Sequence, residues 1–134
     1  MATNLLALDV GGARIGLAVA SAEARIAQPH GWVARDEQTL DRLKQLIEQE
    51  AIGILVLGLP RNLSGEATAQ TVAVQEFAEE LKSLNLPLHF QDEAVTSAQA
   101  EQELQARGQA YEKGDIDALA ATYILEDFLN NNPE

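Results

Sequence analysis

Three apolar runs open the chain, and the short connections between them predict an antiparallel meander. The first run begins at Leu5 and ends in the carboxylate of Asp9, and after a glycine pair a second strand covers Arg14 to Ser21. A short, irregular third strand is expected over Ala27 to Ala34. It should lie at an edge of the sheet, because Pro29 cannot donate a backbone hydrogen bond.

The pattern then changes to alternating helices and strands. Apolar residues recur at helical spacing from Leu40 to Ile47, behind Asp36 as a candidate helix cap. The almost uninterrupted apolar run from Ile52 to Leu59 indicates a central strand covered on both faces, which implies a parallel crossover. A long amphipathic helix and a fifth strand over Leu86 to Gln91 follow. The pattern predicts a single α/β domain over residues 1–134.

Two helices complete the predicted order. The segment from Ala94 to Arg107 is weakly amphipathic, and Gly108 is suited to end it as a C-cap. The last helix is expected from about Asp115 to Asn130. Its inner apolar stripe, counted back from Phe128, includes Asp117. A carboxylate is therefore predicted on the buried side of that helix.

Charge argues against a tight nucleic-acid binder, because such proteins usually present a basic face to phosphate. Nine basic residues stand against 21 acidic ones, a net charge of −12, and the excess lies beyond residue 35. The chain has no cysteine, which excludes disulfides, thiolate nucleophiles and cysteine-ligated zinc. His30 and His89 lack metal-ligand spacing. With no targeting segment or membrane-length apolar run, a cytoplasmic protein without membrane contact is expected.

Acidic residues stand where strands or helices end against the core. Asp9 ends the first strand, Asp92 and Glu93 end the fifth, and Asp117 opens the last helix. Converging carboxylates repel one another unless a cation lies between them. Oxygen ligands favour Mg²⁺ or Mn²⁺, and such sites typically hold two ions that activate water and stabilise the leaving oxygen of a phosphodiester.

Each acid also has a purely structural interpretation. Asp9 could cap the glycine turn, and Asp117 would gain from the helix dipole without binding a ligand. Asp115 is better suited to be the N-cap of the last helix than a metal ligand. Alternation along the fifth strand does not decide which of Asp92 and Glu93 faces the site.

Four motifs, in this order, resemble those of the YqgF/RuvX family over essentially the whole chain. They are Leu8-Asp9-Val10-Gly11 with Arg14-Ile15-Gly16, Gly58-Leu59-Pro60-x-Asn62-x-x-Gly65, Asp92-Glu93-x-x-Thr96, and Ile116-Asp117-x-x-Ala120-Ala121. Members of the family are described as pre-16S rRNA nucleases and as Holliday-junction-resolvase-like proteins. Each motif alone is weak, and the set is specific.

The resemblance implies an RNase H-like fold, a five-stranded mixed sheet with three antiparallel strands followed by two parallel ones, flanked by helices. It implies metal-dependent phosphodiester hydrolysis, with structured RNA such as pre-16S rRNA preferred over branched DNA. Position by position, it assigns Asp9, Glu93 and Asp117 as catalytic metal ligands. The residues it suggests for gripping the substrate backbone are Arg14, Arg61 and Asn62. A ribosomal particle is a candidate partner, and either a monomer or a homodimer is compatible.

Some basic positions of the family are missing. Ala13 and Ala94 stand where lysine and arginine are frequent, which agrees with the acidic charge and favours weak substrate binding. A second hypothesis is therefore a weakened or inactive nucleic-acid-binding or ribosome-associated module. It gains if the basic residues that could replace the missing ones scatter in space, namely Arg14, Arg35, Arg61 and Lys113. An actin-like ATPase is disfavoured, because one short domain lacks a second lobe.

Overall fold

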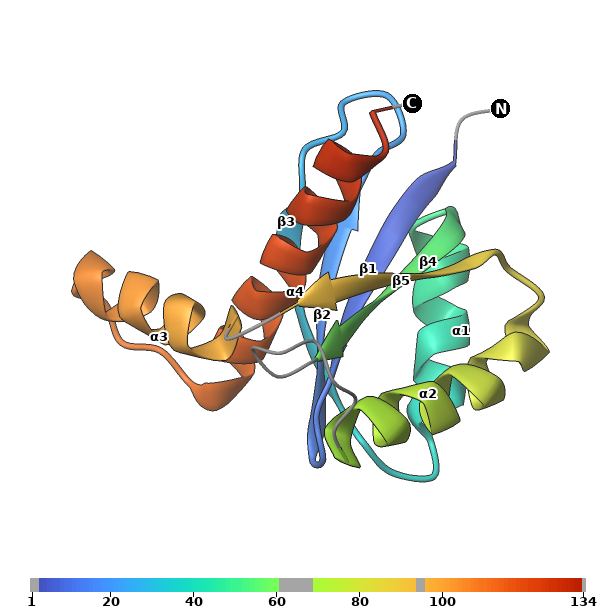
Figure 1. Cartoon of the computed structure of the whole chain (residues 1–134), viewed down its shortest axis with the longest axis horizontal. Helices are drawn as coiled ribbons and strands as arrows, with labels where there is room; N and C mark the ends of the chain where they lie inside the picture. Colours follow the sequence, from blue (N-terminus) through green and yellow to red (C-terminus); the bar gives the residue numbers. More distant parts are fainter. Residues whose placement is uncertain (1–2, 61–68, 94–95, 134) are drawn as a thin grey trace.

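Five strands form one mixed sheet in the order β3-β2-β1-β4-β5 (Figure 1). The computed structural model describes residues 3–60, 69–93 and 96–133. The strands are β1 (Asn4–Val10), β2 (Arg14–Ala20), β3 (Gln28–Ala34), β4 (Ile52–Pro60) and β5 (Leu88–Glu93). The pairs β1–β2 and β2–β3 are antiparallel, whereas β1–β4 and β4–β5 are parallel. This confirms the expected meander, the crossover and the edge position of β3.

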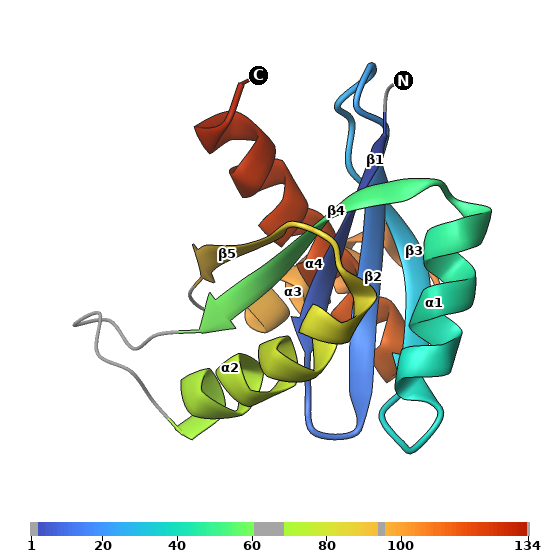
Figure 2. The same cartoon turned by 90° about the vertical axis from the view of Figure 1, so that its right-hand side faces the viewer.

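Helices cover both faces of the sheet (Figure 2). One face carries α1 (Thr39–Gln49) and α2 (Ala69–Leu81), which continues into the short 3-10 turn η1 (Lys82–Leu84). The other face carries the long helix α4 (Lys113–Asn131). The remaining helix, α3 (Thr96–Arg107), packs on α4 and projects away from the sheet (Figure 1). No helix in the described part of the chain is long and apolar enough to cross a membrane.

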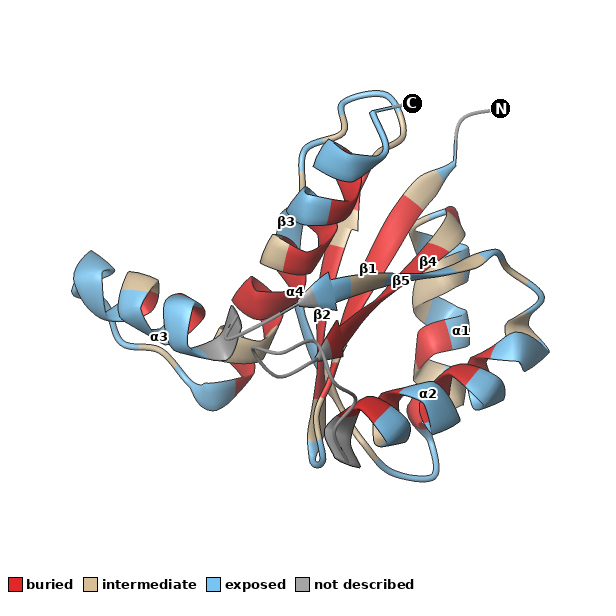
Figure 3. Cartoon of the chain, in the orientation of Figure 1, coloured by how far each residue is buried: buried red, intermediate tan, exposed pale blue. Residues whose placement is uncertain are grey.

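Strand alternation divides the apolar side chains into two cores. Buried residues are concentrated on the central strands and along one side of α4 (Figure 3). On β1, Leu6 and Leu8 point toward α1 and α2, whereas Leu5 and Ala7 point toward α4. Asp9 follows Ala7 in the same alternation and therefore belongs to the α4 face. Because α4 crosses this face, its inner residues decide what lies next to Asp9.

Gly16 allows α4 to lie directly on the sheet. A Cβ atom added at Gly16 would stand 2.0 Å from the backbone oxygen of Asp117, closer than any side chain permits. The pairing of β2 with β3 also shifts register between Gly16 and Ala18. A register shift and a close approach of another backbone are both typical of a glycine within a strand.

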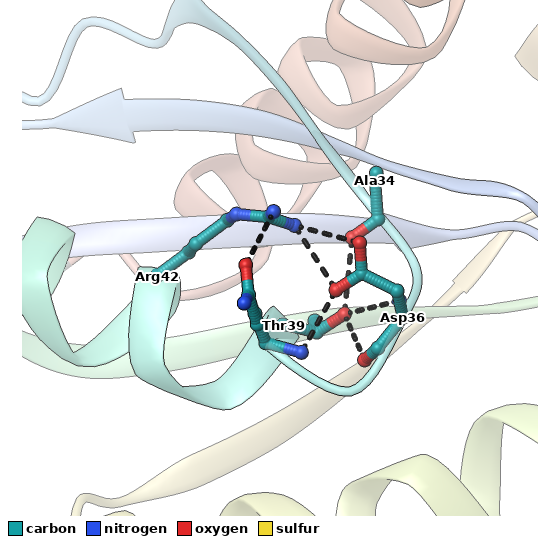
Figure 4. A network of polar contacts seen from close by, with 5 residues as sticks. Ala34, Asp36, Thr39 and Arg42 are labelled. Carbon is teal, nitrogen blue, oxygen red and sulfur yellow. Dashed lines mark hydrogen bonds and ion pairs between the residues drawn. The ribbon is translucent and has the colours of Figure 1, made fainter.

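The helix starts differ from those expected. Asp36 is not the cap of α1, which begins after Gln38. Its carboxylate instead accepts hydrogen bonds from the Gln38 N–H at 2.8 Å and from Arg42 at 3.1 Å, while the Thr39 hydroxyl bonds to Asp36 and Ala34 (Figure 4). Asp36 therefore closes the turn before the helix, an arrangement that competes with N-capping for the same residue type.

Asp115 is likewise not an N-cap. The cap of α4 is Glu112, and Asp115 is the third helical residue, where its carboxylate accepts the backbone N–H of Glu112 at 2.9 Å in a capping box. The fifth strand begins and ends two residues later than expected, so that Asp92 and Glu93 belong to β5 itself. The helix ending at Gly108 is confirmed, with a left-handed φ of 71° at that glycine.

Substituting Gly16 should separate α4 from the sheet. Gly16→Ala is expected to lower the free energy of unfolding by about 3 kcal/mol, because the added methyl group meets rigid helix backbone. Gly12→Ala is the matched control, since an added Cβ there meets no atom within 4 Å, and its effect should stay within about 0.5 kcal/mol. Urea denaturation measures both. Equal stability of the two variants would contradict the packing described.

Candidate functional site

Three residues from three elements meet at the α4 face of the sheet. Asp9 ends β1, Arg14 begins β2, and Asp117 lies in the second turn of α4. Asp9 is paired in register with Gly16, whose missing side chain leaves room for the helix backbone at Asp117. The two acids separated by 108 positions in sequence are thereby brought side by side.

Asp9 is a half-buried carboxylate in an unfavourable environment. Burial, and secondarily the negative charge of Asp117, raise its pKa to about 6. Among residues 3–60, 69–93 and 96–133, no side chain or backbone group donates a hydrogen bond to it. The turn-capping interpretation of Asp9 therefore has no support from these contacts, since a cap would show such a bond.

Asp117 has one partner that Asp9 lacks. The Nε atom of Arg14 donates to Oδ2 of Asp117 at 2.8 Å, and the two side chains are 31% and 21% exposed. This ion pair joins the first residue of β2 to the second turn of α4. Arg14 therefore lies next to Asp117, and its role in binding substrate stays a prediction.

β5 ends at the same edge of the sheet. The carboxyl ends of the parallel strands β1, β4 and β5 lie together, and Glu93 is paired in register with Pro60. Two residues of β5 contact α4: His89 stacks on Phe128 with ring centroids 5.3 Å apart, and Gln91 accepts from Asn131 at 3.4 Å. Because side chains alternate along a strand, position 93 is on the same side of β5 as His89 and Gln91, and Asp92 is on the other side. The side chain of Glu93 lies outside the described residues.

The structure describes only some of the other basic and amide residues predicted for the site. Arg61 and Asn62 lie outside the described residues. Arg35 donates to the Gly11 carbonyl at 2.9 Å and lies over the Phe77 ring at 5.2 Å, which places it on the opposite face, toward α2. Lys113 is exposed at the first position of α4. Of the basic residues that could replace the missing ones, Arg35 thus lies on the opposite face from Arg14, and Lys113 lies one helical turn before Asp117.

The donor set fits a hard divalent cation. Two adjacent carboxylates, one without a hydrogen-bond donor and with a raised pKa, favour a cation between them. The described side chains alone do not contain three potential metal ligands in one group. Glu93 stays the predicted third ligand, and the backbone of β5 ends at position 93, at this edge of the sheet.

Sequence reasoning missed what positions the start of α4. Gly114 is buried there, and a Cβ atom added to it would stand 2.1 Å from the Trp32 ring of β3. Together with the capping box between Glu112 and Asp115, this contact fixes the first turn of the helix that carries Asp117. Glycine lowers helix propensity, so its presence in the first turn of a helix indicates that another group packs closely there. Gly114 could have been recognised in this way.

A family model and several named proteins match this chain over nearly its whole length. The family model described as "RuvX: Holliday junction resolvase" matches residues 3–131. A protein of Synechocystis sp. named "Putative pre-16S rRNA nuclease" is 39% identical over 130 residues, covering 93% of this chain and 86% of its own length. A protein of Chloroflexus aurantiacus with the same name is 40% identical over 131 residues, covering 94% and 86%.

Solved structures share the fold. The RuvC protein of Thermus thermophilus, solved in complex with a Holliday junction substrate, superposes with a TM-score of 0.56 at 15% identity and covers 96% of both chains. The yeast mitochondrial Holliday junction resolvase Ydc2 superposes with a TM-score of 0.51 at 13% identity, covering 95% of this chain and 78% of its own. The expected RNase H-like arrangement of three antiparallel and two parallel strands is confirmed.

The raised pKa of Asp9 makes stability depend on pH. Its pKa lies above the unfolded value of 3.8, so the folded state is favoured while Asp9 is protonated and loses that advantage as pH rises through about 6. In buffers containing EDTA, Asp9→Asn should therefore be more stable than the wild type by about 3 kcal/mol above pH 7, and by much less at pH 3.5. Urea denaturation across this range measures the difference, and a constant difference would contradict the assignment.

Asp36→Asn is the control of opposite sign. The backbone N–H of Gln38, and then Arg42, lower the pKa of Asp36. Its ionised form is therefore stabilised in the folded state. The substitution should destabilise the protein at neutral pH, with the loss fading as pH falls through the lowered pKa.

Proposed function

Because the chain belongs to the RuvX family, we propose that it is a cytoplasmic, divalent-metal-dependent endonuclease that hydrolyses phosphodiester bonds of structured RNA. The observation that carries this proposal is the pair of carboxylates, Asp9 and Asp117, held together at the sheet by the contact of α4 with Gly16. The similar proteins that are named for pre-16S rRNA favour that RNA as the substrate class.

Asp9 and Asp117 would hold the cation, Mg²⁺ or Mn²⁺, with Glu93 as the third ligand. The parity of position 93 with His89 and Gln91 supports Glu93 over Asp92 for this role. When bound, such ions supply a nucleophilic water and stabilise the leaving oxygen, and two of them are typical for phosphodiester hydrolysis. Asp9 must be ionised to bind a cation, so the affinity for the metal should fall as pH drops below about 6.

The basic and amide residues would orient the substrate. Arg14, already at the site, can donate to a phosphate oxygen. Arg61 and Asn62 come directly after the last residue of β4 in the sequence, and ligands of α/β sheets bind outside the carboxyl ends of such strands, which supports a role in contacting the RNA backbone. The net charge of −12 leaves few further cations for phosphate, so we expect weak binding that depends on the metal or on a ribosomal partner.

Branched DNA is the second candidate substrate. The family model is described as a Holliday junction resolvase, and the Thermus thermophilus structure was solved with such a junction. At 15% identity, the shared fold carries no argument about the substrate. The relatives near 40% identity are named for pre-16S rRNA. Structured RNA is therefore the primary assignment.

Cleavage of structured RNA tests the proposal directly. With Mn²⁺ at pH 8, the wild type should cleave a pre-16S rRNA fragment that retains its folded ends, and Asp9→Asn and Asp117→Asn should each be slower by at least about 100-fold, because each removes a carboxylate ligand. Glu93→Gln should lose activity similarly and Asp92→Asn should not. Gel analysis of end-labelled RNA measures the rates.

The matched control is Asp36→Asn, which removes one negative charge at an exposed position whose carboxylate bonds only Gln38 and Arg42 among the described residues. It should retain the wild-type rate. Equal cleavage by all the variants would contradict the catalytic assignment, and binding of RNA without cleavage by the wild type would favour the inactive binding module. Faster cleavage of a four-way DNA junction than of RNA would favour the resolvase.

A further inference from the structure

We propose that Arg14 is an exchangeable counter-cation of the site: it neutralises Asp117 while no metal is bound and leaves that carboxylate when a divalent cation binds there. This inference rests on the proposed function, because it concerns the same acidic site. It assigns Arg14 two successive partners, first a carboxylate of its own chain and then the phosphate of the substrate.

The ion pair between Arg14 and Asp117 differs from the other ion pairs of the described residues. Those others join residues three to six positions apart on exposed surface: Arg42 with Asp36, Lys82 with Glu79, and Arg107 with Glu103. Arg14 and Asp117 are 103 positions apart and partly buried. Residues so far apart in sequence meet only because α4 packs directly on β2.

The position of the pair makes it compete with a metal. Asp117 accepts a hydrogen bond from Arg14 through Oδ2, 2.8 Å away, and the backbone of Asp117 lies against Gly16, the residue paired with Asp9. Arg14 thus satisfies one acid of the site and leaves the other without a hydrogen-bond donor among the described residues. A divalent cation between the two carboxylates would satisfy both and would repel the guanidinium.

Release of Arg14 would couple metal binding to substrate binding. Arg14 is the first residue of β2, directly after the turn from β1. Its guanidinium therefore stays beside the site after leaving Asp117. A phosphate oxygen is a suitable new partner, because guanidinium groups bind phosphate through charge-assisted hydrogen bonds. In this acidic chain, a cation that is available only once the metal is in place would favour binding of substrate to the loaded site.

Calorimetric titration of Mn²⁺ at pH 8 tests the competition. Arg14→Gln should bind Mn²⁺ about fivefold more tightly than the wild type, since no guanidinium has to be displaced from Asp117. Arg42→Gln is the matched control: it removes one positive charge from an exposed pair at the start of α1 and should leave the dissociation constant unchanged. Tighter binding by both variants would indicate a general charge effect and overturn the inference.

Nuclear magnetic resonance observes the release itself. The Nε–H signal of Arg14, identified by its absence from Arg14→Gln, should shift or broaden during a titration with diamagnetic Mg²⁺, while the Nε–H signal of Arg42 should not. A role of Arg14 in folding alone would leave this signal unchanged.

The outcomes separate this inference from the proposed function. If the wild type binds Mn²⁺ with Asp9 and Asp117 as ligands, but Arg14→Gln binds it equally or more weakly, the exchange is wrong and the metal site stands. An Arg14 signal unchanged at saturating Mg²⁺ also overturns the exchange alone. If neither protein binds Mn²⁺ or Mg²⁺, both the exchange and the metal-dependent function are wrong.

Discussion

The direct contact between the backbone of α4 and Gly16 is the constraint on which the site depends. A side chain at position 16 would hold the helix away from the sheet, and Asp117 would no longer stand beside Asp9. The contact is reinforced at the start of the helix, where Gly114 lies against Trp32 and Glu112 and Asp115 close the capping box. Small residues thus bring two acids together that the apolar core alone would leave apart.

Electrostatics makes this arrangement unfavourable without a cation. Asp9 is half-buried, lacks a hydrogen-bond donor among the described residues and lies beside a second negative charge. Arg14 compensates Asp117 and not Asp9. A site that lowers folding stability at neutral pH is typical of functional residues, because the same unfavourable charge that destabilises the fold strengthens cation binding.

Much of this could be predicted from the sequence, because apolar periodicity reports burial. The central position of β4 and the inner stripe of α4, on which Asp117 lies, follow from which side chains avoid water. The edge position of β3 follows instead from Pro29, which cannot donate a backbone hydrogen bond. Helix starts were predicted less well. Asp36 and Asp115 both bind backbone N–H groups, as expected, but one closes a turn before its helix and the other lies inside its helix.

The remaining differences concern contacts between distant segments. Periodicity does not reveal that Arg35 lies over Phe77, that Arg14 pairs with Asp117, or that Trp32 packs on Gly114, because each depends on how layers meet in space. For the same reason, strand alternation alone does not say which of Asp92 and Glu93 is on the side of β5 that faces α4. His89 and Gln91 contact α4, and position 93 is on the same side of the strand as these two residues.

The most direct test of the account is the position of a bound metal. Crystals soaked in Mn²⁺ at pH 8 should show an anomalous difference peak within coordination distance, roughly 2.0–2.3 Å, of carboxylate oxygens of both Asp9 and Asp117. No peak between these two residues, or a peak held only by surface acids elsewhere, would contradict the central claim that their approach creates a metal site.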